Sequence, residues 1–411
     1  MPSSVPVPPG HVRLATSSPS TQSTTKATLA HLRQIAQRAA VDHRADILLL
    51  PEAYIGGYPR GAGFGSVVGS RSAEGRDEFL RYFEQAADLG DVVGEGAGGG
   101  DDWVHRRLGG DGLRDDVRGD GTREELERIA ADTGVFIVTG LIEKAGGSLY
   151  CAAVYVCPKR GIIGKRRKVM PTGSERLIWA QGSPKTLQAV STTIRGTRIN
   201  MAAAICWESY MPLLRQALYS QNINLYLAPT ADGRDAWLSL IRTIGIEGRC
   251  FVVSSNMTVP EDGSRPGDHH EAVKQHKVND VSYDDGTGVV HLHGPESRRT
   301  SVAIEADGVK HTSYDAGTGV AHHPEQTQDA KKKKKSTAEE WISRGGSAIT
   351  GPFGDVLAGP SWEDDTEIIY ADVDFKDSIR GRLDLDAGGS YSRNDSFKFS
   401  VQGLNLSPLP Y

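Results

Sequence analysis

The sequence contains no apolar run of about 18 residues or more, the length that suggests a membrane-spanning helix. Its first residues, MPSSVPVPPG, include neither a basic nor a long apolar stretch, so no signal peptide is predicted. Lysine and arginine number 47 against 52 aspartates and glutamates, which gives a net charge of −5 and no basic excess. We therefore expect a soluble, cytoplasmic protein that binds neither nucleic acid nor a membrane surface.

Cysteine is also scarce. The chain has four, Cys151, Cys157, Cys206 and Cys250, and they lack the spacing of a metal site. In a reducing compartment they are expected to be free thiols. Hydrophobic residues make up only 38% of the chain, while 48 residues are glycine and 20 are proline, so part of the chain is expected to lie outside a packed core.

Short apolar segments alternate with amphipathic helical segments through the first 257 residues. In residues 24–41, Leu29, Leu32, Ile35 and Ala39 recur at helical spacing. The apolar segments contain few polar positions, which is typical of strands that are buried on both faces. The pattern predicts an α/β fold with sheets inside and helices outside, and strands at residues 11–17, 46–50, 135–142, 150–156, 200–205, 225–228, 251–255, 347–350, 356–358 and 367–373.

Two segments interrupt this pattern. Residues 90–121 hold 11 glycines among many charges, and residues 258–340 hold eight of the twelve histidines but only two aromatic residues. Neither keeps a helix or strand period, so both are predicted to be flexible insertions, and the histidines are interpreted as solvated loop residues. We predict a single domain over residues 1–411 that ends in an extended arm at about 391–411. This arm is expected to dock on its own subunit or on a neighbour.

Cys206 ends the apolar segment NMAAAIC, and only WES separates it from a predicted helix, YMPLLRQALYS. A side chain at such a strand-to-helix corner projects free of both elements, and the positive end of the helix is expected to lower the thiol pKa. We interpret Cys206 as a nucleophile, with a buried structural cysteine as the alternative. Cys151, Cys157 and Cys250 lie on predicted strands without such a corner and are expected to pack in the core.

Glu52 ends the strand segment DILLLPE and is expected at the rim of a sheet. A carboxylate that is partly desolvated at this rim has a raised pKa, as a general base at neutral pH requires. A strand-end carboxylate that is satisfied by backbone donors is the alternative. The glycine-rich segment that follows lacks a phosphate-loop pattern, so a nucleotide site is not predicted there.

A third candidate is GKRRKVMPTGSERLIWAQG, in which Lys168 and Glu175 flank a proline turn. An ammonium group near a thiolate favours the charged sulfur and can stabilise an anionic addition intermediate. Without such a partner, KRRK is simply a basic surface patch. No histidine stands near Cys206 in a suggestive motif, so a glutamate or lysine partner has better-marked candidates than a histidine.

Taken together, LLLPEAYIGGYPRGAGFG, GKRRKVMPTGSERLIWAQG and AAICWESYMPLLRQALYSQNINLYLAPTADGRDAW resemble the nitrilase branch of the carbon-nitrogen hydrolase superfamily, in its plant and fungal form. The resemblance covers about residues 11–257 and 345–400, and the two insertions depart from it. It implies a four-layer α-β-β-α sandwich and a Glu-Lys-Cys triad with a second glutamate. The matching positions are Glu52 as general base, Lys168 as the lysine, Glu175 as the second glutamate and Cys206 as the nucleophile.

The resemblance further implies hydrolysis of a small organic nitrile to the carboxylic acid and ammonia, through a covalent thioimidate and thioester on Cys206. No metal or cofactor is expected. A cyanide or cyanoalanine hydratase, an amidase, or a catalytically silent binding member of the superfamily are the alternatives. Tyr58 and Trp207 adjoin these positions and are expected either to wall the substrate pocket or to pack in the core. Family members commonly form dimers and longer spiral assemblies, so a homo-oligomer is implied.

Overall fold

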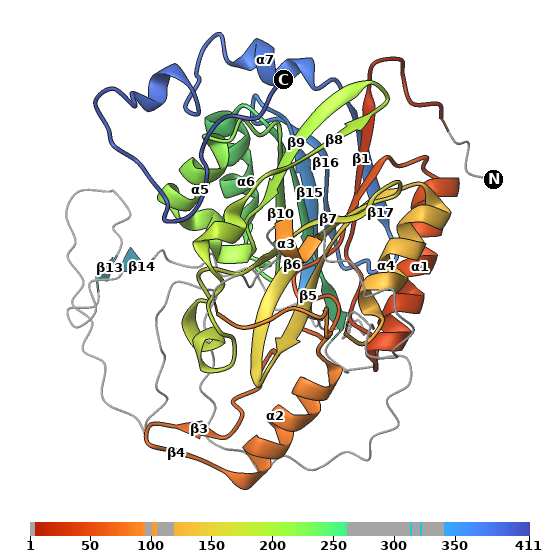
Figure 1. Ribbon diagram of the computed structural model, residues 1–411, viewed down its shortest axis with the longest axis vertical. Helices are drawn as coiled ribbons and strands as arrows, with labels where there is room; N and C mark the ends of the chain where they lie inside the picture. Colours follow the sequence, from red (N-terminus) through yellow and green to blue (C-terminus); the bar gives the residue numbers. More distant parts are fainter. Residues whose placement is uncertain (1–4, 95–100, 105–118, 261–312, 315–320, 323–340) are drawn as a thin grey trace. The chain divides into compact units, whose positions relative to one another are not determined.

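The computed structural model describes residues 5–94, 101–104, 119–260, 313–314, 321–322 and 341–411 (Figure 1). The chain divides into two compact units. The first comprises Met1–His269 and Glu340–Tyr411, and the second comprises His270–Glu339. The described part of the second unit is one antiparallel pair of short strands, β13 (Ser313–Tyr314) and β14 (Ala321–His322). All further description concerns the first unit.

A six-stranded mixed sheet forms one half of the first unit, in the order β17-β1-β2-β5-β6-β7. Strands β1, β2 and β5 are parallel neighbours, and the other pairs are antiparallel. Every residue of β1 and of β2 is buried, as continuous apolar strands require. The strands are β1 (Val12–Ser17), β2 (Ile47–Leu49), β5 (Phe136–Ala145), β6 (Ser148–Cys157), β7 (Gly161–Arg167) and β17 (Ile368–Val373).

A second sheet has the order β12-β15-β11-β10-β9-β8, with β16 paired to β15. Its central strands β9, β10 and β11 are parallel. Strands β7 and β8 were not predicted from the sequence, because polar residues break their apolar runs. Strand β12 lies at residues 258–260, at the start of a predicted flexible insertion, so that boundary of the insertion was wrong. The strands are β8 (Val190–Ile194), β9 (Thr197–Ala203), β10 (Leu225–Thr230), β11 (Phe251–Asn256), β12 (Thr258–Pro260), β15 (Trp341–Thr350) and β16 (Val356–Trp362).

Helices cover the outer face of each sheet (Figure 1). Helices α1 (Thr25–Val41) and α4 (Thr122–Thr133) pack against the first sheet, and α5 (Pro212–Tyr219) and α6 (Asp235–Gly248) against the second. A third apolar core lies between the two sheets and includes Leu14, Leu49, Val138, Met201, Leu227 and Val253. The four-layer α-β-β-α arrangement that the resemblance implies is confirmed.

Short elements connect these layers. They are β3 (Ser66–Val67), β4 (Ser70–Arg71), α2 (Ala73–Gln85), α3 (Asp101–Val104), η1 (Gly173–Leu177), η2 (Pro184–Leu187), η3 (Cys206–Tyr210), α7 (Lys376–Gly381) and η4 (Ser390–Ser392). Within the part of the chain that the structure describes, no helix is both long and apolar enough to span a bilayer.

Most of the two predicted insertions, residues 95–100, 105–118, 261–312, 315–320 and 323–340, lies outside the described residues. Within the first insertion, Trp103 is buried. Its ring lies 4.4 Å from Lys165 Nζ and 4.4 Å from the Arg123 guanidinium carbon. This position is therefore packed against the first sheet. That residues 1–411 form a single domain stays a prediction.

The C-terminal arm, residues 391–411, docks on its own chain. Its apolar side chains pack against the core beneath α5 and α6. The Leu409 amide donates to the Gln221 carbonyl at 3.0 Å, and Asn200 Nδ2 donates to the Pro410 carbonyl at 2.9 Å. The first of the two expected docking modes is thus observed.

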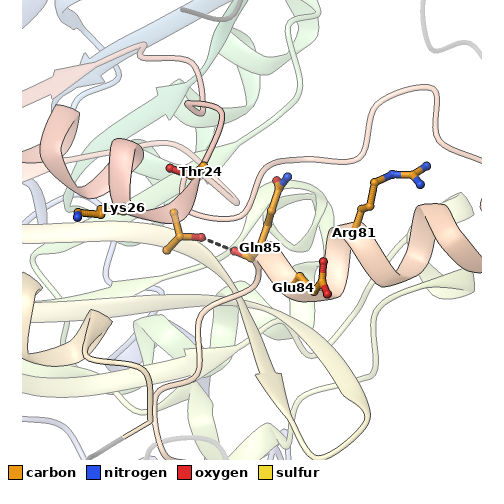
Figure 2. Close-up of a pocket in the computed structure, with 6 residues that line it drawn as sticks. Thr24, Lys26, Arg81, Glu84 and Gln85 are labelled. Carbon is orange, nitrogen blue, oxygen red and sulfur yellow. Dashed lines mark hydrogen bonds between the residues drawn. The ribbon is translucent and has the colours of Figure 1, made fainter. Parts of the chain in front are cut away.

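A surface cavity of about 370 Å³ lies between the start of α1 and the end of α2 (Figure 2). Thr24, Lys26, Arg81, Glu84 and Gln85 line it, and Thr25 Oγ1 donates to the Gln85 carbonyl at 2.6 Å. None of the predicted site residues lines this cavity.

Candidate active site

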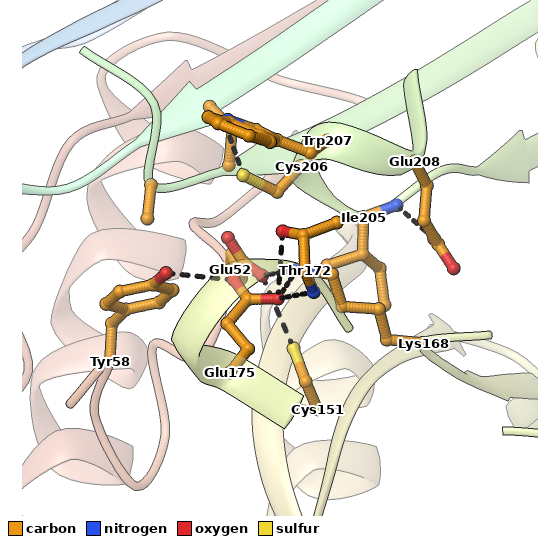
Figure 3. A network of polar contacts seen from close by, with 12 residues as sticks. Glu52, Tyr58, Cys151, Lys168, Thr172, Glu175, Ile205, Cys206, Trp207 and Glu208 are labelled. Carbon is orange, nitrogen blue, oxygen red and sulfur yellow. Dashed lines mark hydrogen bonds and ion pairs between the residues drawn. The ribbon is translucent and has the colours of Figure 1, made fainter. Parts of the chain in front are cut away.

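Four residues predicted to carry chemistry come together between the two sheets. Glu52 stands three residues after β2, Lys168 directly after β7, Glu175 in η1, and Cys206 at the start of η3. Their exposed fractions are 0%, 0%, 6% and 3%. Figure 3 shows the four side chains converging from separate segments. We refer to them below as the four-residue cluster.

Lys168 links the two carboxylates of the cluster. Its Nζ donates to Glu52 Oε1 at 2.7 Å and to Glu175 Oε2 at 2.8 Å. Burial lowers the pKa of Lys168, but the negative charges of Glu52 and Glu175 outweigh it, so the pKa is raised well above its usual value. Lys168 is therefore a fixed positive charge in a buried site.

Glu175 is held in place by three further donors. The Thr172 amide and Oγ1 donate to Oε2 at 2.8 and 3.4 Å, and Tyr58 OH donates to Oε1 at 2.8 Å. The contact with the Thr172 amide caps the first turn of η1. Both carboxylate oxygens are thus occupied, which suits Glu175 to fix Lys168 rather than to accept a proton.

Cys206 occupies a strained corner between β9 and η3. Its φ of 54° is left-handed, a conformation that side chains other than glycine rarely adopt. Thr230 Oγ1 donates to the sulfur at 3.2 Å, and the same Oγ1 accepts from the Asp232 amide at 3.0 Å. Because the Thr230 hydroxyl donates its hydrogen to the sulfur, the thiol hydrogen of Cys206 can be donated to a different acceptor.

The expectation that the corner lowers the thiol pKa is wrong. Burial raises the pKa of Cys206, the charge of Glu52 adds to this increase, and Lys168 opposes it. A 3₁₀ turn follows the sulfur, and the helix α5 begins only at Pro212. The resting cysteine is therefore a neutral thiol that needs a base to become a nucleophile.

Glu52 has the properties of that base. Burial raises the pKa of its carboxyl; the Lys168 charge lowers it and the Glu175 charge raises it. Oε1 accepts from Lys168 and, at 3.6 Å, from the thiol of Cys151. Oε2 makes no hydrogen bond to any residue that the structure describes, although it is buried. One oxygen is thus anchored, and the other is available for a proton.

The basic segment before Lys168 is not a surface patch. Lys165, Arg166 and Arg167 belong to β7 and are at most 3% exposed. The three charges are balanced inside the protein by three carboxylates, because Lys165 and Arg167 both contact Asp91 and Glu143, and Arg166 contacts Glu208. Buried charges need such partners. The alternative interpretation of this segment as a surface patch is therefore wrong.

The two predicted pocket residues differ in their surroundings. Tyr58 is partly buried, hydrogen-bonds Glu175 and meets the Trp179 ring edge-on at 5.5 Å. Trp207 is 39% exposed, its Nε1 donates to Asp232 Oδ2 at 3.0 Å, and the Arg234 guanidinium lies 4.7 Å from its ring. This exposure excludes a core-packing role for Trp207. Tyr58 contacts the four-residue cluster directly.

The model of the family described as "Carbon-nitrogen hydrolase" matches residues 12–382. The chain is 36% identical over 357 residues to "Nitrilase blr3397" of Bradyrhizobium diazoefficiens, a match that covers 87% of this chain and 81% of that protein. It is 34% identical over 382 residues to an arylacetonitrilase of Trametes versicolor, with 91% of each chain covered. The chain belongs to the nitrilases of the carbon-nitrogen hydrolase family. A solved carbon-nitrogen hydrolase from Helicobacter pylori G27 shares the fold, with a TM-score of 0.52 at 14% identity over 91% of this chain and 92% of that one.

In this carbon-nitrogen hydrolase, sequence reasoning missed three residues of the site. Cys151 was expected to pack in the core, yet its thiol contacts Glu52; its strand β6 pairs with β7, which delivers Lys168. Thr230 contacts the Cys206 sulfur. Glu208 accepts hydrogen bonds from Val169, next to Lys168, and from Ile205, next to Cys206. Only the position of Glu208 two residues after Cys206 offered a local signal.

Proposed function

We propose that the protein hydrolyses a small organic nitrile to the carboxylic acid and ammonia, with Cys206 as the nucleophile. The observation that carries this proposal is the four-residue cluster itself. It combines a buried neutral thiol, an ammonium group held by two carboxylates, and a carboxylate of raised pKa whose Oε2 accepts no hydrogen bond from the described residues. These are the parts that covalent addition to a carbon-nitrogen multiple bond requires.

In the first step, Glu52 Oε2 takes the thiol proton as the Cys206 sulfur attacks the nitrile carbon. The carbon-sulfur bond forms, one π bond of the nitrile breaks, and the proton passes from Glu52 to the nitrogen. The product is a thioimidate on Cys206. Lys168 lies beside Glu52 and stabilises the negative charge that develops on nitrogen.

Water then adds to the thioimidate carbon, with Glu52 as its base. The tetrahedral adduct expels ammonia and leaves a thioester on Cys206. A second water hydrolyses the thioester to the carboxylic acid and restores the thiol. Two waters are consumed for each nitrile, and no oxidant or reductant is needed.

Tyr58 and Trp207 are the proposed walls of the substrate pocket. Tyr58 reaches the cluster through Glu175, and Trp207 follows the nucleophile directly and keeps an exposed ring. Aromatic walls of this kind bind an apolar substituent while leaving the reacting carbon to the polar cluster.

An amide product is the second candidate, and the same site favours it if the tetrahedral adduct expels the sulfur instead of ammonia. A panel of aliphatic, aryl and arylacetic nitriles, assayed for ammonia, acid and amide, separates the two. Acid with an equal amount of ammonia is the expected result. Amide without ammonia supports a hydratase, and no turnover of any nitrile contradicts both.

We also propose a cytoplasmic homo-oligomer. All four cysteines are free and buried, which suits a reducing compartment. Leu213 on α5, Ile246 on α6 and Phe353 expose large apolar side chains, as a subunit interface does. Light scattering on the purified protein tests the assembly, and a monomer at all concentrations contradicts it.

A further inference from the structure

Glu208 lies outside the four-residue cluster but receives hydrogen bonds from both segments that flank it. Its Oε1 accepts from Arg166 Nη2 at 2.6 Å, the Val169 amide at 2.6 Å and the Met170 amide at 3.2 Å. Its Oε2 accepts from the Ile205 amide at 2.8 Å. The side chain is fully buried.

These contacts join two segments from different sheets. Val169 directly follows Lys168, at the end of β7 in the first sheet. Ile205 directly precedes Cys206, after β9 in the second sheet. One carboxylate therefore ties the backbone beside the ammonium group to the backbone beside the thiol.

Arg166 completes the link. Its Nη1 donates to the Ala203 carbonyl at the end of β9 at 2.8 Å, while Nη2 holds Glu208. Arg166 is 1% exposed, and its positive charge is balanced inside the protein by the carboxylate of Glu208. Hydrogen bonds to a buried charge are stronger and more directional than bonds between neutral groups.

The same carboxylate supports the strained corner. Cys206 has a φ of 54°, which costs free energy for a residue with a side chain. The bond from the Ile205 amide to Glu208 fixes the residue just before this corner. Without that bond the turn is free to relax and to move the sulfur.

We propose that Glu208, with Arg166, is a positioning residue that sets the distance between Lys168 and the Cys206 sulfur. The inference rests on the proposed function, and it assigns to Glu208 no contact with substrate. Sub-ångström placement of the two groups then depends on a side chain that neither reacts nor binds the nitrile.

Glu208→Gln keeps the shape of the side chain but removes the charge and turns one acceptor into a donor. We expect kcat to fall by about 10²-fold with KM little changed, because misplacement of a reacting group costs roughly this factor. Arg166→Lys keeps the positive charge but removes the second guanidinium nitrogen, which contacts Ala203, so kcat should fall by a smaller factor. This variant replaces Glu208→Gln in the test if Glu208→Gln does not fold.

Asp372→Asn is the matched control. Asp372 accepts two hydrogen bonds from the buried Arg13, Nε to Oδ1 at 2.7 Å and Nη2 to Oδ2 at 2.6 Å, between β1 and β17. This variant also leaves a buried guanidinium without its carboxylate, so its melting temperature should fall as well. Its kcat should match that of the unchanged protein, because neither residue touches the four-residue cluster.

The deciding measurement is the rate at which iodoacetamide alkylates Cys206, followed by mass spectrometry of the Cys206 peptide. Slower alkylation and lower kcat in Glu208→Gln, with neither change in Asp372→Asn, support the inference. Unchanged alkylation in Glu208→Gln, or an equal loss in the control, overturns it. If the unchanged protein hydrolyses no nitrile, the proposed function fails, and the alkylation rates still decide whether Glu208 positions the thiol.

Discussion

Lys168 donates from Nζ to Glu52 Oε1 at 2.7 Å, and neither side chain is exposed to solvent. This contact distinguishes the two oxygens of Glu52. Oε1 is anchored to a permanent positive charge, while Oε2 has no hydrogen-bond partner among the described residues. A carboxylate held in this way can accept the thiol proton without turning, because the free oxygen is already fixed in place.

Glu52→Gln tests whether this carboxylate is the base. The amide keeps the size of the side chain and can still accept from Lys168, but it cannot take a proton. We expect kcat/KM to fall by about 10²–10⁴-fold, the usual contribution of general acid-base catalysis. Substrate binding, measured by the affinity for a product acid, should be preserved. Activity near that of the unchanged protein contradicts the role.

The pH dependence of kcat/KM provides a second test. Burial raises the pKa of Glu52 above its ordinary value of 4.5. Because Glu52 must be deprotonated to act, activity is lost as the pH falls through this raised pKa. The acid limb should therefore lie above pH 4.5. An acid limb at or below that value contradicts the assignment.

Cys151→Ala tests the thiol that contacts Glu52 Oε1. Burial raises the pKa of Cys151 well above its usual value, so the thiol keeps its proton and remains a donor. Removing a donor to the carboxylate raises the pKa of Glu52 further, and the acid limb should move to higher pH by a few tenths to about one unit.

Cys157→Ala is the matched control for this prediction. Cys157 lies on the same strand, β6, and in the same core between the sheets, but no hydrogen bond joins it to Glu52. Both variants remove one buried sulfur, so both should lose similar stability. A shift of the acid limb in both variants, or in neither, shows that the Cys151 contact does not tune the base.

Part of this site could be predicted from local sequence. Glu52 and Cys206 each stand three residues after the end of a strand with an apolar end, β2 and β9, and such positions lie at the rim of a sheet. Lys168 and Glu175 were candidates from the sequence, but their roles in a triad with a second glutamate came from the resemblance, because a lysine in a basic segment and a glutamate in a polar turn also look like surface residues. Helix α1 followed from its helical spacing and the central strands from their continuous apolar runs, whereas helices α2, α4 and α6 were not predicted residue by residue.

The missed residues have a common physical reason. Cys151 and Thr230 lie on strands, and the pairing of strands and the stacking of sheets decide which residues they contact. Cys151 contacts Glu52, 99 residues away in sequence, and Thr230 contacts Cys206, 24 residues away, and local patterns do not encode such contacts. The buried basic residues of β7 were likewise hidden, since Glu143 and Glu208 stand far away in sequence. The neutral state of Cys206 follows from burial, which only the packed structure reveals.

The most direct test of the account is mass spectrometry of the protein quenched during turnover of a nitrile, with Cys206→Ala as its control. The unchanged protein should carry an acyl or thioimidate adduct on the Cys206 peptide and on no other cysteine. The variant should carry none and release no ammonia, while its circular-dichroism spectrum shows that it is still folded. Ammonia release by Cys206→Ala, or turnover without any adduct on Cys206, contradicts the central claim.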